Sequence, residues 1–281
     1  MKSDIDYIKL NGDQLKLLQE EMFSLLIEVD RICEKHGIPY FLSDGTLLGA
    51  IRHDGYIPWD DDVDIQMLRK DYDRFCEVCK SELNHEKFFL QNQKLDKNYN
   101  WVFGKLRLKN TSYIRAGQEH LEQKDGICMD IFPLDYISSN KYKQRLLMSI
   151  CKVCRKILWS HVGKKNAGSV YSRTLFKALS FMPRNFTIAV FEYFAKWDNE
   201  KETSHIVCHN LVGHIFEREW YDEAIKVNFE GHAFRAPKRY DDILTSRYGK
   251  YMELPPVDKQ HGHSYASFIR FSNGLQLKLH K

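Results

Sequence analysis

The chain has 281 residues, 43% hydrophobic and 28% charged, a balance that excludes extensive disorder. Its formal net charge of +4 is too small to indicate a nucleic-acid binder, so we predict no nucleic-acid partner. The first residues are polar, and no apolar run reaches membrane-spanning length. Together with seven cysteines, an odd number that favours free thiols, these features predict a cytoplasmic protein.

Helix and strand patterns alternate through the first half of the chain. Apolar residues recur at steps of three and four over residues 13–36, which predicts an amphipathic helix that ends at Gly37. Further helices are expected near 47–52 and 71–84, and strands near 40–42, 63–67, 87–93, 101–109 and 127–132. This order predicts an α/β (α+β) fold in which a mixed sheet is flanked by helices.

The second half of the chain has a different character. From Lys141 to about Trp197 the pattern is mostly helical and basic, and the tail mixes short strands with turns. We therefore expect three regions, namely a core at 1–137, a helical region inserted at 138–225, and a C-terminal segment at 226–281 that packs back on the core.

Four aspartates lie within five residues, at Asp60, Asp61, Asp62 and Asp64. Like charges this close repel one another, and a divalent cation would relieve the repulsion. Mg²⁺ or Mn²⁺ prefers oxygen ligands and combines carboxylates with substrate phosphates. Residues two apart on a strand face the same side, so Asp62 and Asp64 are predicted to share the cation, with Asp60 nearby and Asp61 turned away. A solvated acidic turn is the alternative, which the apolar neighbours of this run disfavour.

Other residues extend the predicted metal site. Asp130 is a lone acid in an apolar strand, where an unpaired carboxylate is costly, so we predict that it is the third carboxylate. A position on an edge strand facing water is its alternative. Gly45 and Thr46 follow a short strand at the start of a helix, where a phosphate can approach the backbone.

The segment 41–65, FLSDGTLLGAIRHDGYIPWDDDVDI, resembles the signature of the LicD family, which includes the fukutin-related ribitol-phosphate transferases. Segments 103–111 and 130–135 resemble the family as well, and 226–264 does so moderately. The resemblance implies a nucleotidyltransferase-like catalytic core. It also implies transfer of a phospho-alcohol, phosphocholine before ribitol phosphate, from a CDP-activated alcohol donor. The acceptor would be a sugar hydroxyl of a surface glycan such as lipopolysaccharide or teichoic acid, with or without a lipid carrier, and CMP would be released.

The resemblance also assigns roles to residues. It makes Asp62 and Asp64 the paired metal ligands and catalytic residues, together with Asp130. Lys105 and Arg107 share a strand face and would clamp phosphates, unless that face is a solvent-exposed edge. The residues expected to bind substrate are Gly45, Thr46, Arg52, His53, Lys105, Arg107 and His232.

Two alternative functions remain open from sequence. A nucleotidyltransferase that uses an NTP and releases pyrophosphate would need the same metal site. A non-enzymatic module that binds cations or glycans would not need the apolar surroundings of the aspartates.

The segment 141–159 is basic and carries an apolar stripe. It predicts either a helix that packs on the core or one that lies on an anionic membrane surface, which would place the protein at the inner face of the membrane.

Overall fold

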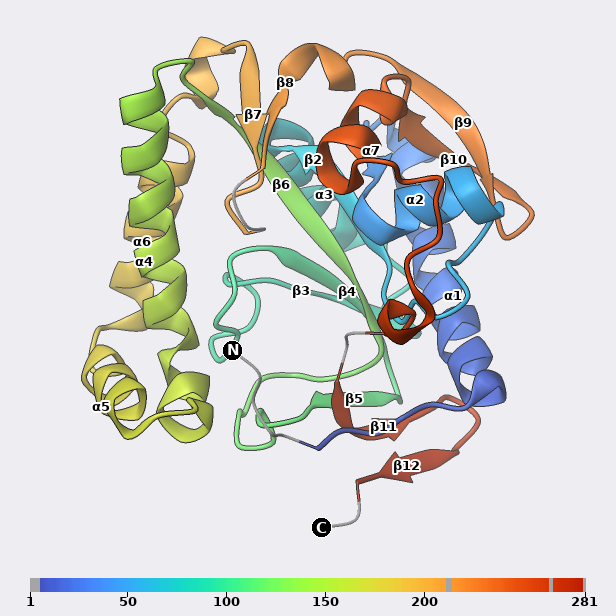
Figure 1. Cartoon of the computed structure of the whole chain (residues 1–281), viewed down its shortest axis with the longest axis horizontal. Coiled ribbons are helices and arrows are strands. Elements are labelled where there is room, and N and C mark those ends of the chain that lie inside the picture. The colour runs from blue at the N-terminus through green and yellow to red at the C-terminus, as the bar shows by residue number, and fades with distance from the viewer. Residues whose placement is uncertain (1–5, 211–213, 263–264, 280–281) are drawn as a thin grey trace.

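A computed structural model describes residues 6–210, 214–262 and 265–279 (Figure 1). The helices are α1 (Gly12–His36), α2 (Asp44–His53), α3 (Arg69–Glu82), α4 (Lys141–Asn166), α5 (Val170–Leu179), α6 (Arg184–Ala195) and α7 (Tyr240–Tyr248). The strands are β1 (Phe41–Leu42), β2 (Asp64–Leu68), β3 (Phe88–Gln91), β4 (Gly104–Leu108), β5 (Ser112–Arg115), β6 (Cys128–Ile137), β7 (His205–Val207), β8 (Ile215–Glu217), β9 (Ala224–Phe229), β10 (His232–Pro237), β11 (Ala266–Arg270) and β12 (Gln276–Lys278). The predicted α/β (α+β) class is confirmed.

The main sheet has the order β1-β2-β6-β4-β3, with β7 and β8 continuing from the far half of β6. Strands β2 and β6 are parallel, and β4 runs antiparallel to β6. Helices α1 and α3 contact each other and β6, so they cover one face of this sheet. The fully buried side chains of Ile65, Met67 and Ile131 belong to the core. Successive side chains of a strand point to opposite faces of the sheet. The residues that alternate with these apolar ones therefore lie on the other face.

The expected helix over 13–36 is well formed, and its ends explain its length. Asn11 caps the N-terminus by accepting a hydrogen bond from the backbone N–H of Gln14, whose side chain accepts one from Asn11 in return. Gly37 ends the helix in the left-handed conformation, at a φ of 59°, which glycine adopts without a steric penalty.

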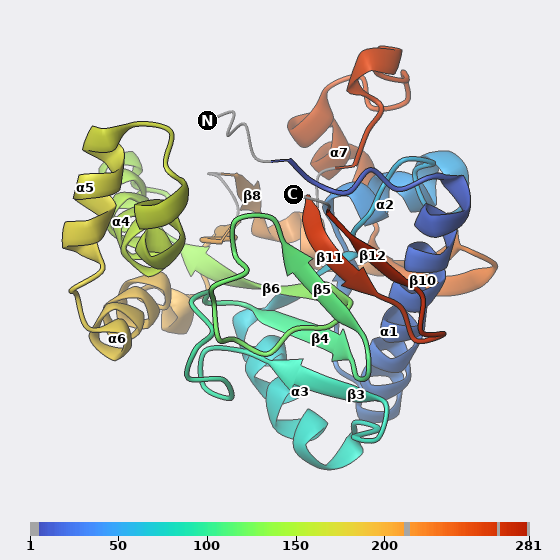
Figure 2. The same cartoon turned by 90° about the horizontal axis from the view of Figure 1, so that it is seen from below.

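Helices α4, α5 and α6 form a separate group at one side of the molecule in both views (Figures 1 and 2). Cys151, Cys154 and Leu158 of α4 pack with Phe191 of α6 in a small cluster that also contains Val102. The packing alternative therefore holds for the buried residues of the apolar face of α4, whereas Leu146 and Val153 of the same stripe are exposed. Within the described residues, no helix is both long and apolar enough to cross a membrane.

The C-terminal part returns to the core along two routes. Strand β11 pairs with β5, and the hairpin of β9 and β10 lies against α2 and β1. Helix α7 was not expected from the sequence, where this stretch reads as strands and turns. It buries Ile243 and Leu244, and the rest of its surface is polar or half-exposed, which left little apolar periodicity to detect.

Candidate active site

One row of charged side chains crosses three strands of the main sheet. Asp64 on β2 lies opposite Asp130 on β6, and Asp130 lies opposite Lys105 on β4. Directly paired residues project from the same face of a sheet, so the three side chains converge. The Lys105 ammonium forms an ion pair with the Asp130 carboxylate. Lys105 is thus the partner that the half-buried Asp130 carboxylate requires.

A loop immediately before β2 adds three more carboxylates. Oxygen atoms of Asp60, Asp61 and Asp62 lie within 4.8 Å of one another. The expectation that Asp61 turns away is wrong, because β2 begins only at Asp64 and the alternation of a strand does not apply to the loop. With the parity argument removed, Asp61 belongs to the same acidic cluster as its neighbours.

Electrostatic repulsion raises the pKa of two carboxylates at this site, the buried Asp60 and the half-buried Asp64. Burial, and then the charges of Asp62 and Asp61, raise the pKa of Asp60 to about 8. Burial also raises the pKa of Asp64 well above its ordinary value, helped by the charges of Asp62 and Asp130. Carboxylates in such surroundings bind protons or cations readily, because either one removes the repulsion.

This repulsion predicts a pH-dependent stability of the metal-free protein. The Asp60 pKa of about 8 exceeds the ordinary 3.8, so the folded state holds its proton over that interval while the unfolded state loses it. The titration of Asp60 should therefore lower stability as pH rises from about 4 to about 8, by at most ~1.4 kcal/mol per pH unit, and the raised pKa of Asp64 acts in the same direction. Thermal melts in EDTA measure the total slope. Asp60→Asn should make this slope shallower without removing it, and an unchanged slope in that variant would show that Asp60 does not contribute.

Gly45 and Thr46, at the start of α2, directly support the acidic loop. The Thr46 hydroxyl accepts a hydrogen bond of 2.9 Å from the backbone N–H of Asp64. A Cβ at Gly45 would lie 2.6 Å from Oδ2 of Asp60, closer than real contacts allow. Because Gly45 has no side chain, the Asp60 carboxylate can occupy the space beside it. This role is separate from the predicted contact with phosphate.

We therefore expect Gly45→Ala to displace Asp60 and to weaken Mg²⁺ binding by roughly tenfold or more, since a rearranged carboxylate no longer faces the cation. Isothermal titration with Mg²⁺ or Mn²⁺ measures the effect. Gly12→Ala is a matched control, because a Cβ at Gly12 meets nothing within 4 Å. Equal affinities in the two variants would contradict the steric argument.

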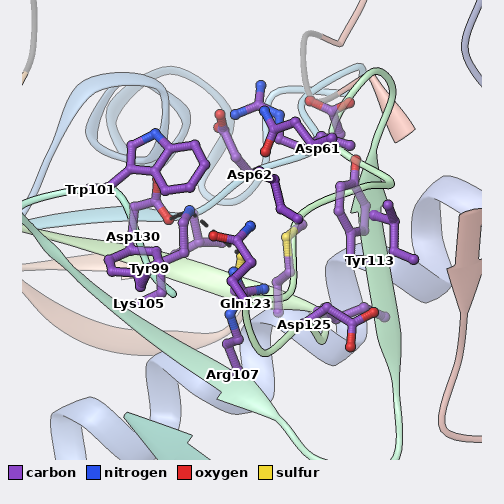
Figure 3. Close-up of a pocket in the computed structure, with 18 of the residues that line it drawn as sticks. Asp61, Asp62, Tyr99, Trp101, Lys105, Arg107, Tyr113, Gln123, Asp125 and Asp130 are labelled. Carbon is purple, nitrogen blue, oxygen red and sulfur yellow. Dashed lines mark hydrogen bonds and ion pairs between the residues drawn. The ribbon is translucent and has the colours of Figure 1, made fainter. Parts of the chain in front are cut away.

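A cavity of about 330 Å³ opens beside the aspartates (Figure 3). Asp61, Asp62 and Asp130 line one part of it together with Lys105. The aromatic and polar side chains of the wall are Tyr99, Trp101, Phe103, Tyr113, Gln118, Glu119, Gln123 and Asp125, and Arg107 and Arg115 also line it. The remaining lining residues are Leu18, Met22, Val63, Ile114, Leu121, Ile127 and Cys128. The cavity therefore joins an acidic end to an aromatic wall.

Arg107 also lines the cavity but is held by protein groups. It is buried, and its guanidinium donates to Oε1 of Gln91 at 2.5 Å and to the carbonyl of Gly126 at 2.6 Å. The solvent-facing strand edge considered for Lys105 and Arg107 is wrong, because both side chains face this cavity.

Three of the expected substrate-binding residues lie elsewhere. Arg52 donates a hydrogen bond of 2.6 Å to the carbonyl of Tyr251, and its side chain lies beside His53. His232, on β10, packs edge-on against the ring of Phe23 at 5.4 Å. Arg52, His53 and His232 are not among the described residues that line the cavity. Arg52 thus fastens the C-terminal segment to α2 in this structure.

The aromatic wall includes residues that no pattern in the sequence singles out. The side chain of Tyr99 is fully buried, and its hydroxyl has no hydrogen-bond partner although it borders the cavity. The ring of Trp101 lies 5.4 Å from that of Tyr99. Both come from the irregular stretch between β3 and β4, where no periodic pattern marks a residue as part of a site.

Comparisons with known proteins define the class to which this fold and acidic site belong. Residues 37–149 match the family described as LicD/FKTN/FKRP, nucleotidyltransferase domain. The chain is also 30% identical over 246 residues to the lipopolysaccharide cholinephosphotransferase LicD of Haemophilus influenzae, a match that covers 83% of this chain and 89% of the relative. Two shorter matches are to uncharacterised Rickettsia proteins. The match in Rickettsia prowazekii is 32% identical over 77 residues and covers 25% of this chain and 29% of the relative. The match in Rickettsia typhi is 39% identical over 78 residues and covers 26% of this chain and 25% of the relative.

The chain belongs to the LicD family, and it is a transferase of the LicD type. The resemblance seen in segment 41–65 is thereby confirmed. The non-enzymatic alternative does not fit this membership.

Proposed function

We propose that this protein transfers phosphocholine from CDP-choline to a sugar hydroxyl of a surface glycan and releases CMP. In this reaction the acceptor oxygen forms a bond to the β-phosphorus of the donor, the bond from that phosphorus to the bridging oxygen breaks, and CMP leaves. The observation that carries the proposal is the cavity that joins carboxylates and Lys105 to an aromatic wall. The relative from Haemophilus influenzae, named as a cholinephosphotransferase of lipopolysaccharide, supports it.

The residues of the acidic end suit a hard divalent cation. Asp60, Asp61 and Asp62 bring oxygen atoms together, and the raised pKa of Asp60 reflects repulsion that a cation would relieve. We propose that Asp62 and Asp64 hold Mg²⁺ or Mn²⁺, with Asp60 and Asp61 close by. When bound, such an ion neutralises charge on a diphosphate and on its leaving group.

Lys105 and Asp130 are placed to act on the transferred group. Lys105 lines the cavity, and its ammonium can contact a phosphate oxygen once the donor competes for it with Asp130. Asp130 then has a free carboxylate oxygen that can accept the proton of the attacking hydroxyl. We propose these two roles together, because the ion pair couples the position of each group to the other.

The aromatic wall favours choline over ribitol as the transferred alcohol. Trp101 and Tyr113 offer aromatic rings, and Glu119 and Asp125 add negative charge nearby, while Arg115 also lines the cavity. A quaternary ammonium is attracted by both features, whereas a polyol such as ribitol needs hydrogen-bonding groups instead. Ribitol phosphate remains the second candidate because Gln118 and Gln123 also line the cavity.

Trp101→Ala should therefore raise KM for CDP-choline by roughly tenfold, the loss expected for one good cation–π contact, while kcat changes less. Initial rates with CDP-choline measure this. Trp197→Ala is the control, since Trp197 is 42% exposed on the far helical group. An equal effect of the two substitutions would remove Trp101 from the choline site.

The nature of the released product separates the proposal from its alternative. The purified protein is incubated with CDP-choline, CDP-ribitol or an NTP, with a glycan acceptor, and with Mg²⁺ or EDTA. We expect CMP from CDP-choline, only in the presence of the metal. Pyrophosphate released from an NTP would support the nucleotidyltransferase alternative and overturn the proposal.

We also propose where the reaction takes place. A glycan that is still attached to a lipid carrier would be presented at a membrane surface, so peripheral association with the inner face of the membrane fits a cytoplasmic enzyme of this kind. The glycan could be part of lipopolysaccharide, as for the relative, or of teichoic acid.

A further inference from the structure

Helix α5 has its apolar side chains on the outside. An ordinary surface helix buries its apolar stripe, but α5 buries only Phe176, which packs 5.1 Å from the ring of Trp159. Val170, Tyr171 and Leu175 are instead exposed, Tyr171 by 80%. Nothing in the described part of the chain covers this face of α5.

The exposed apolar surface continues through the turn into α6. Phe181 is 80% exposed, and Met182 and Phe186 are exposed as well. We define the helical tip patch as these six side chains of one helix–turn–helix. They are Val170, Tyr171, Leu175, Phe181, Met182 and Phe186. Large apolar side chains gathered in this way mark an interaction surface rather than ordinary surface scatter.

The segment of the chain that carries the patch is strongly basic. From residue 136 to residue 191 the chain contains eleven Lys and Arg residues and no Asp or Glu. Lys165, Arg173 and Lys177, which are close to the patch residues in the sequence, are exposed. A second copy docked through the same face would place these cations against their own equivalents, so self-association through this face is disfavoured. A surface of anionic headgroups over an apolar interior matches both features.

We infer that the helical tip patch is a membrane-docking surface that inserts shallowly into an anionic bilayer. The surface differs from the apolar stripe of α4, whose buried residues are already used in packing. Exposed lysines of α4, such as Lys152 and Lys156, can still face the headgroups.

The docking surface connects mechanically to the cavity. The amide of Asn166, at the end of α4, donates to the carbonyl of Gly117, and the ring of His120 hydrogen bonds with the carbonyl of His161 at 2.9 Å. The loop held by these bonds contributes Gln118 and Glu119 to the cavity wall. On α6, Arg184 donates to the carbonyl of Tyr99 at 2.6 Å. A bilayer bound at the patch would therefore hold the rim of the cavity at a fixed height above the lipid.

The test uses the full chain and flotation with two kinds of vesicle, pure phosphatidylcholine and phosphatidylcholine with phosphatidylglycerol. We expect binding to the anionic vesicles and loss of binding in high salt.

The patch variant Tyr171→Ser, Leu175→Ser, Phe181→Ser, Phe186→Ser should bind roughly tenfold or more weakly. Lys165→Gln with Lys177→Gln should cost roughly fivefold per lysine. The matched control Met252→Ser, Leu254→Ser, Val257→Ser removes side chains that are 59%, 59% and 82% exposed elsewhere, and should bind as the wild type does.

A second measurement locates the insertion without weakening it. Phe181→Trp should be quenched by brominated lipid in anionic vesicles, and Val257→Trp should gain no quenching over the wild type. The inference is overturned if the wild type ignores anionic vesicles, if patch and control variants bind equally, or if Phe181→Trp is not quenched. It is also overturned if sedimentation finds a dimer that the patch substitutions abolish, because a second copy would then be the occupant. None of these readouts needs donor or acceptor, so they are independent of the proposed chemistry.

Discussion

Asp62→Asn is expected to lower turnover by roughly 10³-fold or more, because electrostatic stabilisation of the reacting phosphate provides most of the lowering of the barrier in such sites. The fold should persist, since Asp62 is half-buried in a loop and its loss removes repulsion from Asp60 and Asp64. Asp64→Asn should act in the same way. Rates of CMP release and thermal melts are measured side by side.

Glu77→Gln serves as the control for these variants, because Glu77 is 71% exposed on α3 and, within the described residues, forms an ion pair with Lys80 on the same helix. We expect it to match the wild type in rate and melting temperature. Wild-type turnover in either aspartate variant would remove that residue from the metal pair.

Asp135→Asn is expected to lower the free energy of unfolding by about 3 kcal/mol, because it removes the close counter-charge of a buried guanidinium and leaves it the more distant Glu192 carboxylate, at 3.9 Å. Arg69 donates two hydrogen bonds of 2.8 Å to the Asp135 carboxylate, and both side chains are buried. Burial alone would raise the pKa of Asp135, but the charge and hydrogen bonds of Arg69 outweigh it and hold the pKa below its usual value. The stabilisation is therefore present at neutral pH and is lost as the pH falls through the pKa of the folded state.

Urea unfolding at neutral pH measures this loss. The control is Glu223→Gln, which removes one partner of the exposed pair with Lys238 and should change stability by no more than about 0.5 kcal/mol. The double variant Arg69→Met, Asp135→Leu should recover part of the loss, since it buries no unpaired charge. If Asp135→Asn costs no more than the control, the buried pair does not stabilise the fold as we argue.

The local pattern of the sequence was sufficient for the elements that position the acidic row. Helix α1 and strands β2 and β6 show clear periodicity, so Asp64 and Asp130 can be assigned to strands from the sequence, and the structure shows that these two strands are neighbours. The same reasoning is wrong for Asp61, in the loop before β2. The alternation of a strand does not apply at Asp61, because the backbone there is irregular and the Asp61 side chain joins the acidic cluster.

Long-range contacts explain what the sequence could not reveal. Tyr99 and Trp101 reach the cavity from an irregular stretch that Arg184 of α6 fastens in place, across 85 residues of chain. Arg52 was selected because it precedes the acidic loop, yet its partner is the carbonyl of Tyr251, 199 residues further on. Such pairings depend on tertiary packing, which no local pattern encodes.

The central claim is tested most directly by following both halves of the donor. CDP-choline is labelled with ¹⁴C in the choline and with ³²P at the β-phosphate, and is incubated with the protein, Mg²⁺ and a glycan acceptor. We predict that both labels enter the glycan in equal amounts and that one unlabelled CMP is released for each transfer. Incorporation of neither label, or of cytidine instead of choline, would contradict the account.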